Sequence, residues 1–205
     1  MFQSIIHRSI ILVGLLGSLS AEIIDSIKIC AIRVSFNEDD LVSTTGSGNF
    51  LLESEGIDCG SYTIDPVPHD KDYFESQIMA LNSYFRSVSY DKFGINMEGS
   101  VVYPSSQNGS YKLSNTMNYY NPYIENDVQE RRITELFQES IITAYQKDTI
   151  NFSSFDLVVV FHAGIGQDFS LPFLDPTPED IPSTYVDQKM ISDNLNEVGI
   201  SIGEH

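Results

Sequence analysis

Histidine side chains are the residues here best suited to chemistry near neutral pH, because the imidazole ring serves both acid–base catalysis and metal binding. The chain has four, of which His7 lies in the leading apolar segment and His205 is the last residue. His69 stands beside Asp70 just before a segment with helical spacing, where a capping or surface role is expected. His162 ends an apolar run typical of a buried strand, and open α/β sheets bind ligands at the ends of their strands. His162 is therefore the candidate site residue, with a hydrogen-bonded structural histidine as the alternative.

Motifs of the common catalytic centres are absent from the sequence. There is no HExxH pattern, which places two zinc-binding histidines one helical turn apart, and no GxSxG turn for a nucleophilic serine. A GxGxxG or phosphate-binding loop is also missing, since the glycine-containing residues 44–49 (TTGSGN) lack the lysine that would meet a phosphate. We therefore predict no catalytic residue and no set of metal ligands within this chain.

Carboxylates gather in two loop segments and could bind calcium, which prefers oxygen ligands. Neither cluster has the spacing of an EF-hand loop, so solvated loop acids are the alternative interpretation. The two clusters are Glu38, Asp39 and Asp40, and Asp175, Glu179 and Asp180.

Residues 1–21 have the pattern of a secretory signal peptide. Arg8 precedes an uncharged, apolar run over residues 9–19, and small residues up to Ala21 suit a signal peptidase. The apolar run is too short for a helix that spans a bilayer, which needs about 20 residues. We therefore predict a secreted protein of residues 22–205 that has no contact with the membrane after cleavage, and an uncleaved anchor is the alternative.

Export bears on the two cysteines, Cys30 and Cys59, because disulfides persist in oxidising compartments. A bridge between them would contribute about 3 kcal/mol in the chain-entropy model. Cys30 also lies in an apolar, β-branched run, where a buried free thiol is typical. Both alternatives stay open, and two cysteines are too few for a thiolate zinc site.

The charge excludes one broad class of function. With 11 Lys+Arg against 29 Asp+Glu, the formal net charge is −18, so phosphates would be repelled and no nucleic-acid partner is expected. Hydrophobic residues make up 41% of the chain, which indicates a folded domain with a core rather than a disordered segment.

Two amphipathic helices are predicted, over residues 73–87 and 124–144. In the first, four side chains fall on one face and are expected to bury against the strand at 155–162, with Leu81→Ala costing about 2–5 kcal/mol. The four are Phe74, Ile78, Leu81 and Phe85.

Three strands are predicted, over residues 27–36, 95–103 and 155–162. The last, FDLVVVFH, is a continuous apolar run, which is typical of the central strand of a sheet covered on both faces. The alternation of strands and helices predicts an α/β (α+β) domain with a mixed sheet and packed helices, and the sheet is expected to be incomplete at residue 205.

Two stretches resemble a known family. Residues 72–104 contain a helix that ends in a motif of the type YY-x-x-VSYG, matched here from Tyr84 to Tyr90, with Asp91 where glycine is usual. Residues 155–166 contain the motif D-hydrophobic-V-V-hydrophobic-H-A-G, matched from Asp156 to Gly164. In this order and spacing they resemble the N-terminal half of the catalytic domain of immune inhibitor A-like secreted zinc metallopeptidases.

The resemblance implies a zincin-like fold whose zinc lies on an HExxH helix downstream of the strand at 155–163. There the glutamate activates a zinc-bound water against a peptide carbonyl. None of these catalytic residues has a counterpart in this chain. The expected function is thus the N-terminal, non-catalytic portion of a secreted zinc metallopeptidase, which would act on protein or peptide substrates only when completed by the zinc-binding helix.

Two other functions remain open. The chain could be a catalytically inactive, peptidase-like secreted binding module, whose zinc site has been lost. It could also be an unrelated secreted domain stabilised by calcium, in which case the resemblance is a coincidence.

Overall fold

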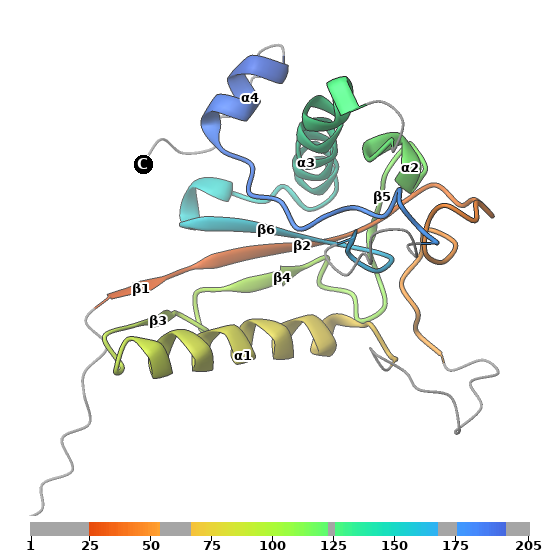
Figure 1. Cartoon of the computed structure of the whole chain (residues 1–205). Coiled ribbons are helices and arrows are strands. Elements are labelled where there is room, and N and C mark those ends of the chain that lie inside the picture. The colour runs from red at the N-terminus through yellow and green to blue at the C-terminus, as the bar shows by residue number, and fades with distance from the viewer. Residues whose placement is uncertain (1–24, 54–66, 123–125, 168–175, 196–205) are drawn as a thin grey trace, which may run out of the picture.

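The computed structural model describes residues 25–53, 67–122, 126–167 and 176–195. Within them a sheet lies between helix α1 on one face and helix α3 on the other, as Figure 1 shows. This arrangement confirms the predicted α/β class. The predicted signal peptide at 1–21 lies outside the described residues.

Groups of strands are separated along the chain by helices. None of the described helices is both long and apolar enough to span a membrane. In chain order they are β1 (Asp25–Ile27), β2 (Ile29–Ser35), α1 (Lys71–Val88), β3 (Phe93–Ile95), β4 (Val101–Tyr103), β5 (Tyr111–Lys112), α2 (Met117–Tyr120), α3 (Asn126–Asp148), the 3-10 helix η1 (Phe152–Ser154), β6 (Leu157–His162) and α4 (Gln188–Asn194).

Strand β2 is the centre of the sheet. On one edge it pairs with β4 and then β5, and on the other it pairs with β6 along its length; Cys30, for example, lies between Val101 and Val158. All pairings among the described strands are parallel, including that of β1 with β3. The prediction that the strand at 155–162 is central was therefore wrong: β6 pairs with β2 alone among the described strands. A continuous apolar run indicates that both faces of a strand are covered. It does not indicate whether other strands pair with it on one side or on both sides.

The strand predicted over 95–103 is divided into β3 and β4 by a tight turn. The side chain of Asn96 accepts a hydrogen bond from Gly99 N at 2.9 Å, and the hydroxyl of Ser100 donates to Asn96 O at 2.7 Å. Ser100 Oγ also accepts from Ile29 N at 2.9 Å, so the turn is attached to the start of β2. β3 pairs with β1 in a two-stranded sheet, whereas β4 pairs with β2 in the four-stranded sheet.

The two faces of β2 supply two apolar clusters. Ile29 and Ala31 pack towards α1, whereas Cys30, Ile32 and Val34 pack towards α3. All five side chains are fully buried. The alternation is that of a strand whose successive side chains point to opposite faces.

Helix α1 confirms the predicted helix but corrects its buried face. Its N-cap is Asp70, whose carboxylate accepts from Tyr73 N at 3.0 Å. Leu81 is 38% exposed, so the expectation that it is buried was wrong. The inward position one residue later is occupied by Asn82, whose Oδ1 accepts from Ile95 N at 2.8 Å. Asn82 and Phe85 are both half-buried, and Leu81 lies at the margin of the interface.

Candidate functional site

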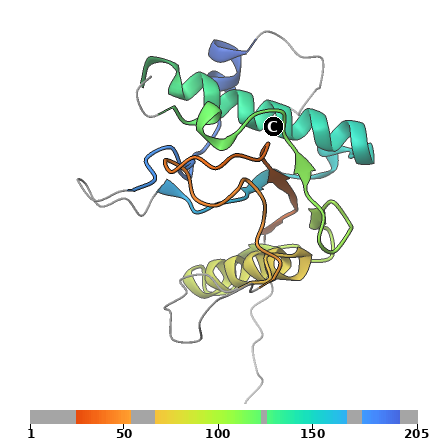
Figure 2. The same cartoon turned by 90° about the vertical axis from the view of Figure 1, so that its right-hand side faces the viewer.

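The loops that follow β2 and β6 meet at the carboxyl end of the sheet, where open α/β sheets bind ligands. Figure 2 shows this end of the molecule towards the viewer. Phe36 N donates to Gly48 O at 2.8 Å, which closes the loop after β2 on itself. Gln167 N donates to Ile181 O at 3.2 Å, which joins the segment after β6 to a loop further along the chain. The candidate site is therefore a cluster of loops, and its chemistry depends on the side chains they contribute.

Asp180 is the buried acid of this cluster, with 2% of its surface exposed. Its carboxylate accepts from Thr45 N at 2.6 Å and from Thr45 Oγ1 at 2.5 Å, and its backbone oxygen accepts from Asn121 Nδ2 at 2.7 Å. Next to it, the Ser43 hydroxyl donates to the Glu179 carboxylate. The acids that the sequence offered as calcium ligands thus act as hydrogen-bond acceptors that hold two loops together.

The other acidic cluster is also used in loop contacts. Asp39 Oδ1 accepts from Leu41 N at 3.0 Å, and Glu38 lies 3.3 Å from Lys112 Nζ. A hydrogen bond from Asn49, together with Lys112, lowers the pKa of the Glu38 carboxyl below its usual value. Glu38 is exposed, whereas Asp39 is half-buried.

His162 lies at the carboxyl end of β6, as predicted. Its Nδ1 is 2.9 Å from Ala163 O, and its ring centroid is 6.1 Å from that of Phe36. An Nδ1 proton shared with a carbonyl leaves the lone pair on Nε2. The backbone beside it is fixed, because Ala163 N donates to Val34 O at 3.0 Å. This environment fits the alternative of a structural histidine at a strand end.

Gly164 makes the turn after β6 possible. Its φ is +92°, a conformation that glycine adopts without strain. A Cβ at this position would lie 2.3 Å from Met117 Cε and 3.2 Å from Thr45 O. The His-Ala-Gly turn is therefore packed closely under the loop after β2 and under α2.

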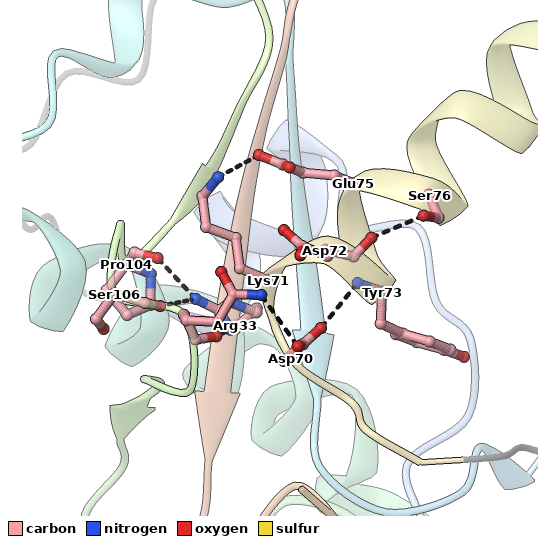
Figure 3. Close-up of polar contacts among 10 residues, drawn as sticks. Arg33, Asp70, Lys71, Asp72, Tyr73, Glu75, Ser76, Pro104 and Ser106 are labelled. Atoms are coloured by element: carbon pink, nitrogen blue, oxygen red, sulfur yellow. Dashed lines mark hydrogen bonds and ion pairs between the residues drawn. The ribbon is translucent and has the colours of Figure 1, made fainter.

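Arg33 is a charged residue of β2, and no motif in the sequence pointed to it. It is fully buried on the α1 side of β2. Its guanidinium donates to Pro104 O at 2.7 Å, to Ser106 O at 2.6 Å and to Gln107 O at 2.8 Å (Figure 3). Burial lowers the pKa of Arg33, and the nearby Asp70 carboxylate opposes that shift. The one signal in the sequence was a charged residue inside an otherwise apolar strand.

The contacts of Arg33 continue to the start of α1. Gln107, whose oxygen accepts from Arg33, also accepts from Lys71 N at 2.9 Å and donates through Nε2 to Asp70 Oδ2 at 3.0 Å. The first turn is completed by an ion pair between Lys71 and Glu75. Arg33 thus positions the loop between β4 and β5, and that loop in turn positions the N-terminus of α1.

Cys30 is a free, fully buried thiol. Burial raises the pKa of this thiol to about 12, so it stays protonated and unsuited to metal binding at neutral pH. Cys59 lies outside the described residues, so the disulfide that the sequence left open stays a prediction.

Metal ions in proteins are held by groups of His, Cys, Asp and Glu side chains, and the calcium and zinc expectations stay predictions. In the ranges that the structure covers, no three His, Cys, Asp or Glu side chains are arranged to hold a metal. Asp175, the remaining acid of the second cluster, lies outside those ranges.

Comparison with known proteins gives no match. No family model matches the chain, no curated protein matches it, and no solved structure matches it. The function must therefore be argued from the residues and their arrangement.

Proposed function

We propose that this chain is the N-terminal, non-catalytic portion of a secreted zinc-dependent metallopeptidase. In this proposal the described α/β unit is a scaffold, and hydrolysis of protein or peptide substrates requires an HExxH helix supplied downstream. Secretion would follow from the signal-like residues 1–21.

The proposal depends on where the family-like motif lies. The run from Asp156 to Gly164 forms β6 and the turn beyond its carboxyl end. This turn lies next to the loops that are joined by the hydrogen bonds of Asp180. Asp156 begins the motif, and its Oδ2 accepts from Lys28 N at 2.7 Å, which sets the register of β6 against β2. The motif residues thus have definite structural roles: an acid that positions the strand, an apolar core, and a glycine turn.

The chemistry expected of this chain is positioning. The HExxH helix would supply zinc and a water-activating glutamate, and the described residues offer no ligand set for that metal. Arg33 and Asp180 instead hold the loops at the carboxyl end of the sheet in place through buried hydrogen bonds, which are strong because the surroundings exclude water.

The test combines an activity assay with a metal analysis. The purified chain, incubated with zinc and casein, is expected to release no peptides, and dialysis is expected to leave far less than one zinc per chain. Cleavage that a chelator abolishes would overturn the proposal. The coding sequence beyond His205 provides the second test, because it is expected to encode HExxH.

A binding module is the alternative that one observation favours. Three apolar side chains at helical spacing on the outer side of α1 are exposed: Leu81 by 38%, Tyr84 by 60% and Val88 by 54%. Exposed apolar stripes often mark protein–protein contacts. An open reading frame that continues without HExxH would favour this alternative over the peptidase.

A further inference from the structure

The loop between β4 and β5 contains a turn at Asn108 and Gly109. Asn108 is exposed and Gly109 is half-buried. The turn is closed by Gly109 N, which donates to Ser106 O at 3.4 Å. This distance is longer than is typical of an N–H···O hydrogen bond, so the Gly109 nitrogen is held only weakly. The turn thus presents an asparagine amide to water, followed by a weakly bonded backbone nitrogen.

An asparagine followed by glycine can react with its own main chain, and asparagine is among the thermolabile residues of proteins. The Gly109 nitrogen attacks Cγ of Asn108 and its proton passes to water, while the bond from Cγ to Nδ2 breaks and Nδ2 takes up a proton and leaves as ammonia. The product is a cyclic imide, which water then opens. Cleavage of the bond from the nitrogen to Cγ gives aspartate, and cleavage of the bond to the main-chain carbonyl carbon gives isoaspartate.

The residue after the asparagine controls whether the nitrogen can approach. Gly109 has no Cβ, so no side chain obstructs the attack. Asn151 is also exposed, but it is followed by Phe152, which is 5% exposed and packs in the core. In addition, Oδ1 of Asn151 accepts from Ser153 Oγ at 2.7 Å, which orients that amide. Asn108 is therefore the reactive position, and Asn151 is the comparison within the same chain.

We propose that Asn108 is a site of spontaneous deamidation in the folded protein, and that the isoaspartate formed there weakens the attachment of β5. Water is the co-reactant: one water is consumed for each ammonia released, and nothing is oxidised or reduced. The inference concerns the chemistry of one turn and does not depend on the proposed function.

The residues on either side of Asn108 are both attached to β2. Gln107 O accepts from Arg33 at 2.8 Å, and Ser110 Oγ donates to Ser35 Oγ at 2.9 Å. Arg33 and Ser35 belong to β2. Isoaspartate carries the main chain through its Cβ, which adds one carbon between these two attachments. The longer connection displaces the start of β5 from β2, whereas aspartate leaves the main chain unchanged.

Peptide mapping by mass spectrometry on the folded full chain tests the proposal. After incubation in mildly alkaline buffer, the peptide that contains Asn108 should gain the mass that separates an acid from an amide, in two chromatographic forms. The peptide that contains Asn151 should be unchanged. Gly109→Ala should slow the gain several-fold, because its Cβ obstructs the attack; this Cβ meets Ser106 Oγ, the end of a flexible side chain that can rotate. Asn151→Gln is the matched control and should leave the rate at Asn108 unchanged.

Thermal unfolding measures the consequence for β5. The melting temperature should fall as isoaspartate accumulates in the unmodified chain. It should stay constant in incubated Asn108→Gln, because the longer side chain closes the corresponding ring much more slowly. Asn108→Asp should melt like the fresh unmodified chain, since it adds the charge without lengthening the main chain.

The proposal is overturned if Asn108 keeps its amide in the folded chain over a time in which the same residue deamidates in urea. It is also overturned if the peptides with Asn108 and Asn151 gain mass at the same rate, or if isoaspartate accumulates at residue 108 without a fall in the melting temperature.

Discussion

The two edges of the sheet differ in the length and continuity of their strands. One edge is made of three short strands: β3 and β4 have three residues each and β5 has two. The Asn96 turn separates β3 from β4, and the loop that Arg33 contacts separates β4 from β5. Pro104 follows β4 directly and cannot donate a backbone hydrogen bond. Short strands and proline are features that keep an edge from pairing further.

The opposite edge is one uninterrupted strand of six residues, β6, without a charge or a proline inside it. Among the described strands, short lengths and Pro104 interrupt the edge formed by β4 and β5, whereas β6 has no such interruption along the other edge. This difference shows where polar residues are used: Arg33 is needed where the edge is broken, because three carbonyls of the intervening loop have no strand to bond with.

The largest expected effect comes from removing the side chain that anchors β6 to α1. The Phe74 ring is 5% exposed, and its centroid lies 4.7 Å from that of Phe161 and 5.1 Å from that of Phe50. Phe74→Ala should lower the free energy of unfolding by about 3–5 kcal/mol, because it leaves a cavity beneath β6. Urea unfolding followed by circular dichroism measures the loss.

Leu81→Ala is the matched control on the same helix. The side chain lies at the margin of the interface with 38% of its surface exposed, so the expected loss is below about 1 kcal/mol. A loss as large as that of Phe74→Ala would contradict the inward face assigned to Asn82.

These two positions show how far the sequence predicts the fold. Helical spacing located both long helices, at 73–87 for the observed Lys71–Val88 and at 124–144 for the observed Asn126–Asp148. It could not distinguish Phe74 from Leu81, because the inward position is occupied by Asn82, whose Oδ1 accepts a hydrogen bond from the backbone N–H of Ile95 in the strand that follows the helix.

The candidate site was less predictable, because its contacts join residues far apart in the chain. Asp180 and Thr45 are separated by 135 positions, and Arg33 bonds to carbonyls 71 to 74 positions away. The spacing of residues within a helix or strand cannot predict contacts between residues so far apart in the chain. The position of His162 at a strand end was correct, since an apolar run followed by a glycine turn is a local signal.

On the edge formed by β4 and β5, Arg33→Met should cost about 2–4 kcal/mol of unfolding free energy, because the hydrogen bonds that the guanidinium donates to the carbonyls of Pro104, Ser106 and Gln107 are lost. Methionine keeps most of the buried apolar stem, so the loss reports the polar contacts. Lys112→Met removes an exposed cation from the same edge and should change stability little. Equal effects of the two variants would remove the distinction between a buried and a surface role.

A smaller effect is expected where β5 is attached to α3. The Tyr111 hydroxyl donates to the Asp148 carboxylate, and burial together with this bond raises the pKa of the phenol. Tyr111→Phe should cost about 1 kcal/mol at neutral pH.

The same tyrosine predicts a dependence on pH. Because its folded pKa is above the unfolded value of about 10, its contribution is fully present below that value and is lost as the pH rises towards the folded pKa. Stability measured through this alkaline range should fall less steeply in Tyr111→Phe than in the unmodified chain. Identical slopes would show that Tyr111 ionises as easily in the folded protein as in the unfolded chain.

The smallest expected effect on stability concerns Asp70, whose contacts attach the loop between β4 and β5 to the start of α1. Hydrogen bonds from Gln107 and from Tyr73 N lower the pKa of this carboxyl. A lowered folded pKa means that its contribution is present above the unfolded value of about 3.9 and is lost as the pH falls through the folded value. Asp70→Asn keeps an acceptor for the cap but cannot titrate, so its melting temperature should decrease less than that of the unmodified chain between pH 5 and acid. If the melting temperatures of the two proteins fall in parallel with pH, the contact of Gln107 with Asp70 does not favour the charged carboxylate. The hydrogen bond from Lys71 N to Gln107 O would then be the contact that attaches this loop to α1.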